Sequence, residues 1–387
     1  MADLSRRQIL RTGGRVAAAA AIGGLAARGA WLSVPKAVAT PAAALDRELR
    51  IGYLPITDAS ALLVAHERGF LAAAGLPSAK PVLFRAWDAL AQALAVGEVD
   101  AVHLLMPMAL QLKLGKKVPL KVVAWGHTNG SALTVGTGIT RTEDLAGRTL
   151  AMPAWWSIHS VLSQRLLRAS GLTPVIGRTA VASKGEVQLV VMPPADMVGA
   201  LASSSIAGFT VADPFGAVAE VRGVGKVHRF LGDVWADHAC CAITVREDLV
   251  TQTPGAVQAL TDGIVAAQAW LDGNRGAAAS VLVGGQYLPQ AEPAIAKVFT
   301  RTADPYSAVT KHAAWHGEKL GFSAFPHASY TSALVDALRT TSVDGDASWL
   351  PSDSASAHAS LVDDRFVSTS LARAGLTIPR RVESIEP

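Results

Sequence analysis

The most reactive side chains of this sequence stand together just past its midpoint. His238 and Ala239 precede the adjacent pair Cys240 and Cys241, which are the only two cysteines among 387 residues. Imidazole and thiolate groups ligate soft metal ions, but one histidine and two adjacent cysteines lack the number and spacing of a closed zinc site. A strained vicinal disulfide is a second interpretation, and two small apolar thiols on a strand between lobes is a third, favoured one. The sequence therefore predicts no metal site, and Cys240 and Cys241 become candidates for lining a ligand cleft.

Three tryptophans and one histidine are further candidates for ligand contact. Trp87 stands at the start of a predicted helix, and Trp155 and Trp156 come shortly before His159 at the head of another. An imidazole N–H near a helix N-terminus suits an anion or a carbonyl oxygen. Core packing of Trp87 and a capping role for His159 are the alternatives, but the paired tryptophans favour a cleft.

Two acidic residues lie where predicted strands end. Thr57 and Asp58 are in the loop after the first strand, and Asp213 precedes Pro214 at the end of a later one. In α/β folds, ligands bind at the carboxyl ends of strands, where loops and helix N-termini offer backbone N–H groups. Asp213 could accept a hydrogen bond from a ligand or hold its own loop, and the sequence favours neither.

Short apolar runs alternate with helical segments from residue 49 onward. A strand at 49–54 is followed by a helix at 60–75, and the same alternation continues, which is typical of an α/β protein with mostly parallel sheets. We predict a first lobe at 46–140, a second lobe at 141–240, and a return at 241–387 that completes the first lobe and adds C-terminal helices.

The sequence contains no recognisable catalytic set. It has no G-x-S-x-G elbow, no phosphate-binding glycine loop and no histidine-rich metal motif. We therefore expect a binding protein without a cofactor rather than an enzyme.

The N-terminus has the order of regions found in an export signal. Arg6 and Arg7 precede a weakly apolar run at 16–25, and Ala37-Val38-Ala39 offers a cleavage site, so residues 1–39 are predicted to be a twin-arginine signal peptide. Residues 1–45 hold six Lys or Arg and one Asp. The remainder has 29 basic and 30 acidic residues, a net charge of −1, against +4 for the whole chain. No nucleic-acid-binding charge remains, and we expect a periplasmic or extracytoplasmic monomer.

Several segments, taken in order, resemble the nitrate- and bicarbonate-binding proteins of ABC importers, within the wider nitrate/sulfonate/taurine-type and thiamine-pyrimidine-precursor-binding superfamily. The resemblance extends over most of the chain after the predicted signal. The segments that carry it are 51–58, 65–70, 97–103, Thr128-Asn129-Gly130, 191–198, 212–215 and 267–270.

The resemblance implies a type II periplasmic-binding fold, in which two α/β lobes close on a ligand between them and present it to a membrane permease and, through it, an ATPase. It also implies that Trp87, Asn129, His159 and Asp213 line the cleft.

Two positions depart from the nitrate-binding pattern. Ser131 stands where that pattern has a glutamine, and Cys241 where it has a lysine. Because burying a small anion without a cation is costly, a neutral or zwitterionic organic solute fits at least as well as nitrate, bicarbonate or a sulfonate. The alternatives are an enzyme similar to the thiamine-pyrimidine synthases that uses Cys240 and Cys241, and a ligand-sensing regulator.

Overall fold

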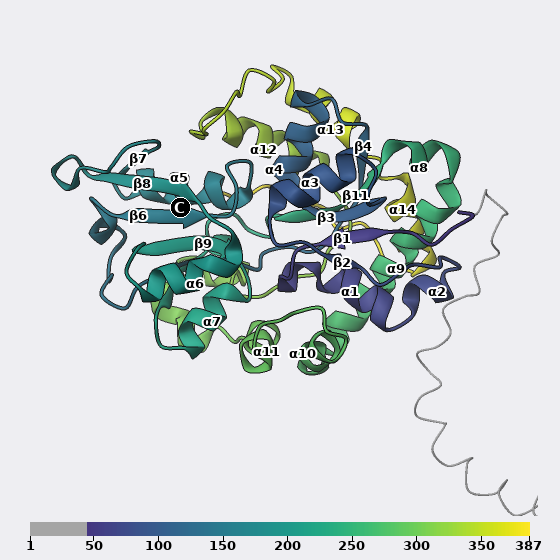
Figure 1. Ribbon diagram of the computed structural model, residues 1–387, viewed down its shortest axis with the longest axis horizontal. Helices are drawn as coiled ribbons and strands as arrows, with labels where there is room; N and C mark the ends of the chain where they lie inside the picture. Colours follow the sequence, from purple (N-terminus) through teal and green to yellow (C-terminus); the bar gives the residue numbers. More distant parts are fainter. Residues whose placement is uncertain (1–44) are drawn as a thin grey trace, which may run out of the picture. The chain divides into compact units, whose positions relative to one another are not determined.

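The computed structural model describes residues 45–387, so the predicted signal peptide at residues 1–39 lies outside the described part of the chain. Two separate β-sheets form the framework (Figure 1). The first has the strand order β2-β1-β3-β11-β4. Its strands are β1 (Ile51–Tyr53), β2 (Val82–Leu83), β3 (Ala101–Leu105), β4 (Leu120–Trp125) and β11 (Cys241–Arg246). The central strand β3 is buried along its whole length, as expected for an apolar run covered on both faces.

The second sheet has the strand order β10-β5-β9-β6-β8-β7. Its strands are β5 (Ser131–Val135), β6 (Thr149–Met152), β7 (Thr173–Val175), β8 (Glu186–Val191), β9 (Gly208–Ala212) and β10 (Lys226–Phe230). Most neighbours are parallel, whereas β5 runs antiparallel to β9 and β10. In the first sheet β11 is the strand that runs antiparallel to its neighbours.

The chain crosses between the sheets twice within residues 120–246. The first crossing, residues 126–130, joins β4 to β5, and the second, residues 231–240, joins β10 to β11. The two crossings contact each other, because the Asn129 N–H donates to the His238 carbonyl over 2.9 Å. Residues 131–140, which the sequence analysis assigns to the first lobe, therefore include a strand of the second sheet. A strand pairs where its hydrogen bonds are made, and the alternation of elements that guided the prediction does not reveal the partner.

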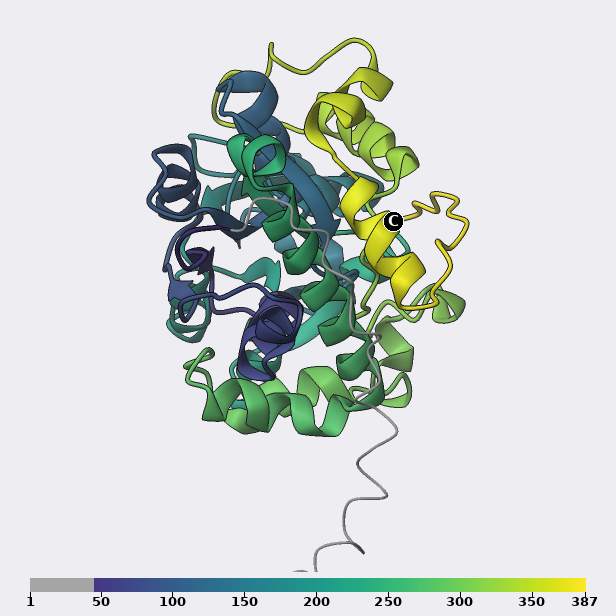
Figure 2. The ribbon, with the colours of Figure 1, turned by 90° about the vertical axis from the view of Figure 1, so that its right-hand side faces the viewer.

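Helices pack on the first sheet and on one another. They are α1 (Ser60–Glu67), α2 (Phe70–Ala73), α3 (Trp87–Ala95), α4 (Met106–Leu110) with a π-helical turn (Gln111–Gly115), α8 (Glu247–Gln252), α9 (Pro254–Gly273) and α14 (Arg365–Arg373). The long helix α9 packs against α1, α2 and α14, and Figure 2 shows α9 in green beside α14 in yellow. The C-terminal segment therefore completes the first unit, as α12 (Ala328–Arg339) and α13 (Ser354–Leu361) also do.

The second sheet is covered by α5 (Ile158–Ala169), α6 (Pro194–Ala202) and α7 (Phe215–Val221). A helical pair connects the two units: α10 (Arg275–Gly284) packs on α1, and α11 (Glu292–Thr300) packs on α7. Short 3-10 turns complete the chain at Thr57–Ala59, Thr142–Leu145, Ala182–Lys184, Leu231–Asp233, Asp304–Val309 and Ala313–Trp315.

The helix predicted at 60–75 is divided. Gly69 has φ +72°, a left-handed conformation that ends α1, and α2 begins at the next residue. Apolar spacing continues through this break, so the periodicity alone does not reveal it. Among the described residues, none of the helices has the length and apolar character needed to cross a membrane.

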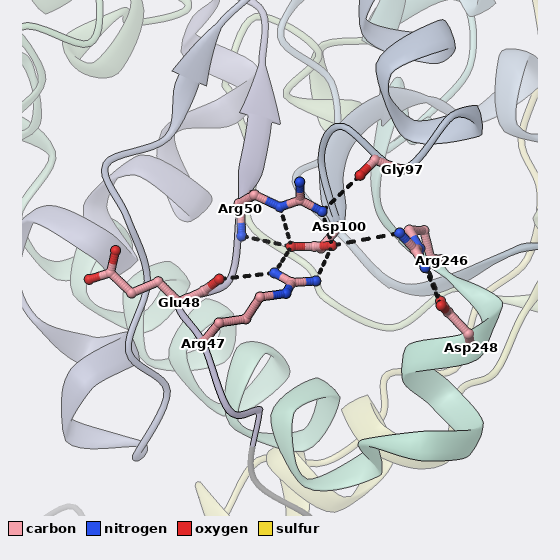
Figure 3. Close-up of polar contacts among 7 residues, drawn as sticks. All are labelled: Arg47, Glu48, Arg50, Gly97, Asp100, Arg246 and Asp248. Atoms are coloured by element: carbon pink, nitrogen blue, oxygen red, sulfur yellow. Dashed lines mark hydrogen bonds and ion pairs between the residues drawn. The ribbon is translucent and has the colours of Figure 1, made fainter.

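A buried aspartate anchors the start of the described chain to β3. Asp100, whose side chain is fully buried, accepts two hydrogen bonds from Arg47 (2.6 and 2.8 Å) and three from the backbone and guanidinium of Arg50 (2.8 to 3.0 Å) (Figure 3). Arg246 Nη1 lies 3.9 Å from Asp100 Oδ1, and the Arg246 guanidinium forms an ion pair with Asp248. Burial by itself would raise the pKa of Asp100. These hydrogen bonds outweigh burial and hold the pKa of Asp100 well below its ordinary value.

Candidate ligand site

The predicted site residues lie at the ends of strands that face the two crossings. Thr57 and Asp58 follow β1, Asp213 follows β9, and Ser131 begins β5 beside Ala212. Cys241 begins β11, which is antiparallel, and pairs with Leu105 at the end of β3. Because an antiparallel strand begins where its parallel neighbours end, all these residues gather at corresponding edges of the two sheets.

Four potential donor groups form the centre of the site. They belong to Asp58, His127, Cys240 and Cys241, all fully buried, and one donor atom from each lies within 4.8 Å of the others. His127 Nε2 contacts Asp58 Oδ2 at 3.0 Å, and the two cysteine sulfurs are 3.5 Å apart. We refer to these four residues as the donor cluster.

The adjacent cysteines both belong to the donor cluster, and only Cys241 is in a strand. Neighbouring residues of a strand point to opposite faces, which would separate Cys240 from Cys241. Cys240 instead ends the second crossing, where its carbonyl accepts a hydrogen bond from Met106 N–H, and the Cys241 carbonyl accepts one from Gly126 N–H. The two thiols lie together, with their sulfurs 3.5 Å apart.

His159 joins the cluster from the second sheet. The Ser157 side chain accepts a hydrogen bond from Ser160 N–H (3.1 Å) and so caps α5, which fixes His159 in the first turn of that helix. His159 Nε2 hydrogen-bonds with Ser131 Oγ at 3.0 Å and lies 3.8 Å from Cys240 Sγ. His159 thus contacts both Ser131 of the second sheet and Cys240 of the donor cluster.

The pKa values of the cluster residues are shifted by burial and by the neighbouring members of the cluster. Burial raises the pKa of Asp58 well above its usual range, and the neighbouring Asp58 and Cys240 raise the pKa of His127 to about 10 although burial opposes this. Burial raises the pKa of the Cys241 thiol, whereas hydrogen bonding from Cys241 and the nearby His159 and His127 lower that of Cys240 against the effect of burial.

Many buried polar atoms of this region make no hydrogen bond within the described chain. They include both carboxylate oxygens of Asp58, both ring nitrogens of His127 and of His103, and Thr57 Oγ1. The 3.0 Å contact between Asp58 and His127 is an ion-pair distance without hydrogen-bond geometry. Because buried polar groups are normally hydrogen-bonded, a group of unpaired ones indicates a site that receives a ligand.

Two other predicted residues take structural roles. Asp213 forms a buried ion pair with Arg301, with Oδ2 at 2.8 Å from Nη1, and its carbonyl accepts from Thr57 N–H. This pair corresponds to the loop-holding alternative that the sequence left open. The side-chain amide of Asn129 donates to Asp237 over 3.1 Å, within the contact between the crossings.

The tryptophans do not gather in the donor cluster. Trp156 packs edge-to-face on Trp349 with ring centroids 4.9 Å apart, and Trp155 is half-buried. Trp87 is buried, and its indole N–H has no partner in the described chain. Their roles in ligand binding stay predictions.

His127, His103 and Arg301 are the residues that sequence reasoning missed. His127 stands directly before the recognised Thr128-Asn129-Gly130 segment, so its position was available, but a lone histidine between strands gave no spacing signal. His103 is in the middle of β3, where its ring is 5.8 Å from that of His127. Burial and the nearby His127 lower the pKa of His103 to about 3, so its ring is neutral.

Comparison with known proteins agrees with this arrangement. Residues 42–283, well over half of the chain, match the NMT1-like family. The chain belongs to the NMT1-like family. This confirms the resemblance found in the sequence, which lies within the same superfamily.

Curated relatives of this NMT1-like chain are transport proteins. The nitrate/nitrite binding protein NrtA of Nostoc is 27% identical over 70% of this chain and 68% of its own length. The bicarbonate-binding protein CmpA of Synechococcus elongatus is 27% identical over 64% of this chain and 60% of its own length. The nitrate import ATP-binding protein NrtC of Synechocystis is 29% identical over 59% of this chain and 35% of its length. The chain thus spans two thirds or less of most of these relatives.

Solved structures confirm the fold. The periplasmic nitrate-binding protein NrtA of Synechocystis superposes with a TM-score of 0.74 over 87% of this chain and 93% of that one, at 20% identity. The predicted fold of two α/β lobes is therefore confirmed. The desulfurization enzyme DSZB has the same overall fold, with a TM-score of 0.51, 17% identity, and coverage of 85% of this chain and all of that one. The NMT1-like fold is thus compatible with binding proteins and with an enzyme.

A glycine in the first crossing packs directly on the donor cluster. Gly130 has φ +77°, and a Cβ there would lie 3.0 Å from Asp58 Oδ1 and 2.5 Å from Leu320 Cδ1. We expect Gly130→Ala to lower the free energy of unfolding by about 1–3 kcal/mol and to weaken ligand binding, measured by urea unfolding and ligand titration. Gly223→Ala is the matched control, because Gly223 has φ +66° with nothing within 4 Å of its Cβ position. Equal ligand affinity in the two variants would contradict this expectation.

Proposed function

We propose that this protein is the extracytoplasmic solute-binding component of an ABC-type importer. One observation carries the proposal: buried polar groups from both sheets meet at the two crossings, and several of them have no hydrogen-bond partner in the described chain. Asp58, His127 and Cys240 approach from the first sheet, and His159 and Ser131 from the second. A ligand bound between two units favours their closed arrangement only through contacts to both, and this site offers such contacts.

The relatives support the transport role. NrtA and CmpA are named for binding nitrate or nitrite and bicarbonate, and a third of NrtC, an import ATP-binding protein, resembles this chain. We propose accordingly that the protein delivers its solute to a membrane permease coupled to an ATPase, and that residues 1–39 direct its export through the twin-arginine route.

Solute binding is tested by thermal melting of the purified protein against small anions, sulfonates, neutral heterocycles and divalent metal ions. A ligand that binds only the folded protein stabilises it by about 2.7 kcal/mol at a hundredfold excess over Kd, so we expect one class to raise Tm by several degrees. His159→Ala should reduce that shift, whereas His358→Ala, outside the site, should not. A panel without any shift would contradict the proposal.

We propose further that the protein releases its ligand chemically unchanged. The alternative is an enzyme that uses Cys240, because its thiol lies beside His159 and has a lowered pKa. Prolonged incubation with the stabilising ligand followed by mass spectrometry separates the two. Consumption of the ligand that Cys240→Ser abolishes would establish an enzyme and overturn the binding role.

A further inference from the structure

We propose that the solute at this site is a thiophilic metal ion of the zinc class, ligated directly by the donor cluster. The inference rests on the proposed function, because it names the class of solute for the same site. It revises the expectation of no metal, which considered His238 and the cysteine pair alone and found too few ligands. The fold supplies the missing ligands from two distant segments, Asp58 after β1 and His127 in the first crossing.

The chemistry of the donors selects the kind of ion. Two thiol sulfurs, one imidazole and one carboxylate form a complete four-coordinate set, and thiolate ligands favour zinc and other soft ions over magnesium or calcium. All four residues are fully buried, so water does not compete for the donors. Neutral His127 has one ring nitrogen with a lone pair, and the carboxylate oxygens of Asp58 are unpaired within the described chain, so both residues can ligate an ion.

The spacing of the donors fits a single atom. Tetrahedral ligands at zinc distances of about 2.0–2.3 Å lie about 3.3–3.8 Å from one another. Here the two sulfurs are 3.5 Å apart, Asp58 and His127 are 3.0 Å apart, and all four donor atoms lie within 4.8 Å of one another. Small side-chain rotations would complete the tetrahedron, whereas an organic solute would need the donors to separate by several ångströms.

The backbone holds these donors in place. The Cys240 carbonyl is bonded to Met106 N–H, the Cys241 carbonyl to Gly126 N–H, and the Ala239 carbonyl to Tyr330 Oη. Gly130 packs against Asp58 and His127. Outer contacts of this kind orient ligands and raise metal affinity. His159, 3.8 Å from Cys240 Sγ, would transmit the presence of the ion to the second sheet.

The charges around the cluster disfavour an anionic solute. Asp58 is itself acidic, and the buried guanidinium near this region, that of Arg301, is already paired with Asp213. Cys241 stands at the position where the resemblance implies a lysine. A nitrate, bicarbonate or sulfonate would therefore be placed beside a carboxyl group and two thiols, where the one imidazole of the cluster, that of His127, already contacts Asp58, and this is unfavourable in a buried site.

The test is metal titration of the reduced full-length protein. Free thiols are first counted with a thiol reagent. We expect one Zn²⁺ per chain, and we expect Co²⁺ to occupy the same site with the visible and near-ultraviolet bands of a tetrahedral, thiolate-ligated ion. Cys240→Ser, Cys241→Ser and His127→Gln should each weaken Zn²⁺ binding at least 100-fold in competition with a chelator. His228→Gln, whose half-buried histidine bonds Thr142 far from the cluster, is the matched control and should bind Zn²⁺ as the parent does.

The outcomes distinguish failure of the metal inference from failure of the proposed solute-binding function. If Zn²⁺ does not bind but an anion or organic solute raises Tm, the metal inference is overturned and the solute-binding function stands. If no solute of any class binds, both fail. Zn²⁺ binding that survives in all three ligand variants, or recovery of the protein from cells with Cys240 and Cys241 joined in a disulfide, would also overturn the inference.

Discussion

Replacing Arg301 with methionine is expected to lower the free energy of unfolding by about 3–5 kcal/mol. The Arg301 and Asp213 side chains are 1% and 2% exposed, and two nitrogen–oxygen contacts of 2.8 and 3.3 Å join them. Removing the cation leaves the Asp213 carboxylate buried without its partner, and water cannot reach it. The substitution also removes the stacking of the guanidinium on Phe230 and Tyr306.

Urea unfolding at pH 7 measures this effect, and two further variants establish its cause. Arg275→Met removes a cation from a partly exposed pair with Asp272, so we expect a loss of less than about 1 kcal/mol. The double variant Asp213→Asn/Arg301→Met should recover part of the stability lost in Arg301→Met, because neither charge then remains buried. If Arg301→Met lowers the free energy of unfolding by less than about 1 kcal/mol, water must reach the unpaired Asp213 carboxylate and solvate it.

The position of this ion pair explains why it matters to the site. Arg301 directly follows α11, whereas Asp213 directly follows β9 of the second sheet, and the Asp213 carbonyl holds Thr57 next to Asp58. The pair thus connects the C-terminal segment to the second sheet and to the loop that carries Asp58. We infer that Asp213, a predicted ligand-binding residue, holds the loop that carries Asp58, a member of the donor cluster.

Local sequence patterns were sufficient to predict the sheets and most of the donor cluster. Asp58 was found because residues at strand ends gather at one edge of an α/β sheet, whereas Ser131 and His159 were found through the resemblance to nitrate-binding proteins. The chain position of a strand end is visible as an apolar run that stops. This reasoning depends on the rules for α/β connections and not on the details of packing.

The remaining residues depend on contacts that no local pattern encodes. His127 is brought to Asp58 by the turn of the first crossing, and Arg301 reaches Asp213 across 88 residues of sequence. Local patterns likewise do not reveal that the chain enters the second sheet at β5, because that depends on which strands pair with β5. The cysteine pair was identified from the sequence but was not interpreted as part of a metal site. The other two ligands, Asp58 and His127, come from distant segments that only the fold brings to the pair.

The other large effect is expected at the start of the described chain. Asp100→Asn should lower the free energy of unfolding at pH 7 by about 2–4 kcal/mol, because a neutral amide cannot accept the charge-assisted hydrogen bonds from Arg47 and Arg50 (Figure 3). The cost is below that of Arg301→Met, since both arginine side chains are about two-fifths exposed and water can solvate them.

This difference between the parent and Asp100→Asn should depend on pH in a defined direction. The pKa of Asp100 is depressed in the folded protein, from an ordinary value of 3.8, so its stabilisation is complete above about pH 5 and is lost as the pH falls toward the folded-state pKa. Unfolding free energies of the two proteins should therefore converge below about pH 4, by up to about 1.4 kcal/mol for each pH unit. Asp144→Asn is the control, because Asp144 also has a lowered pKa, of about 2, but lies on the surface, where its contacts contribute less. A difference that stays constant from pH 7 to pH 3 would show that Asp100 acts through its shape and not through its charge.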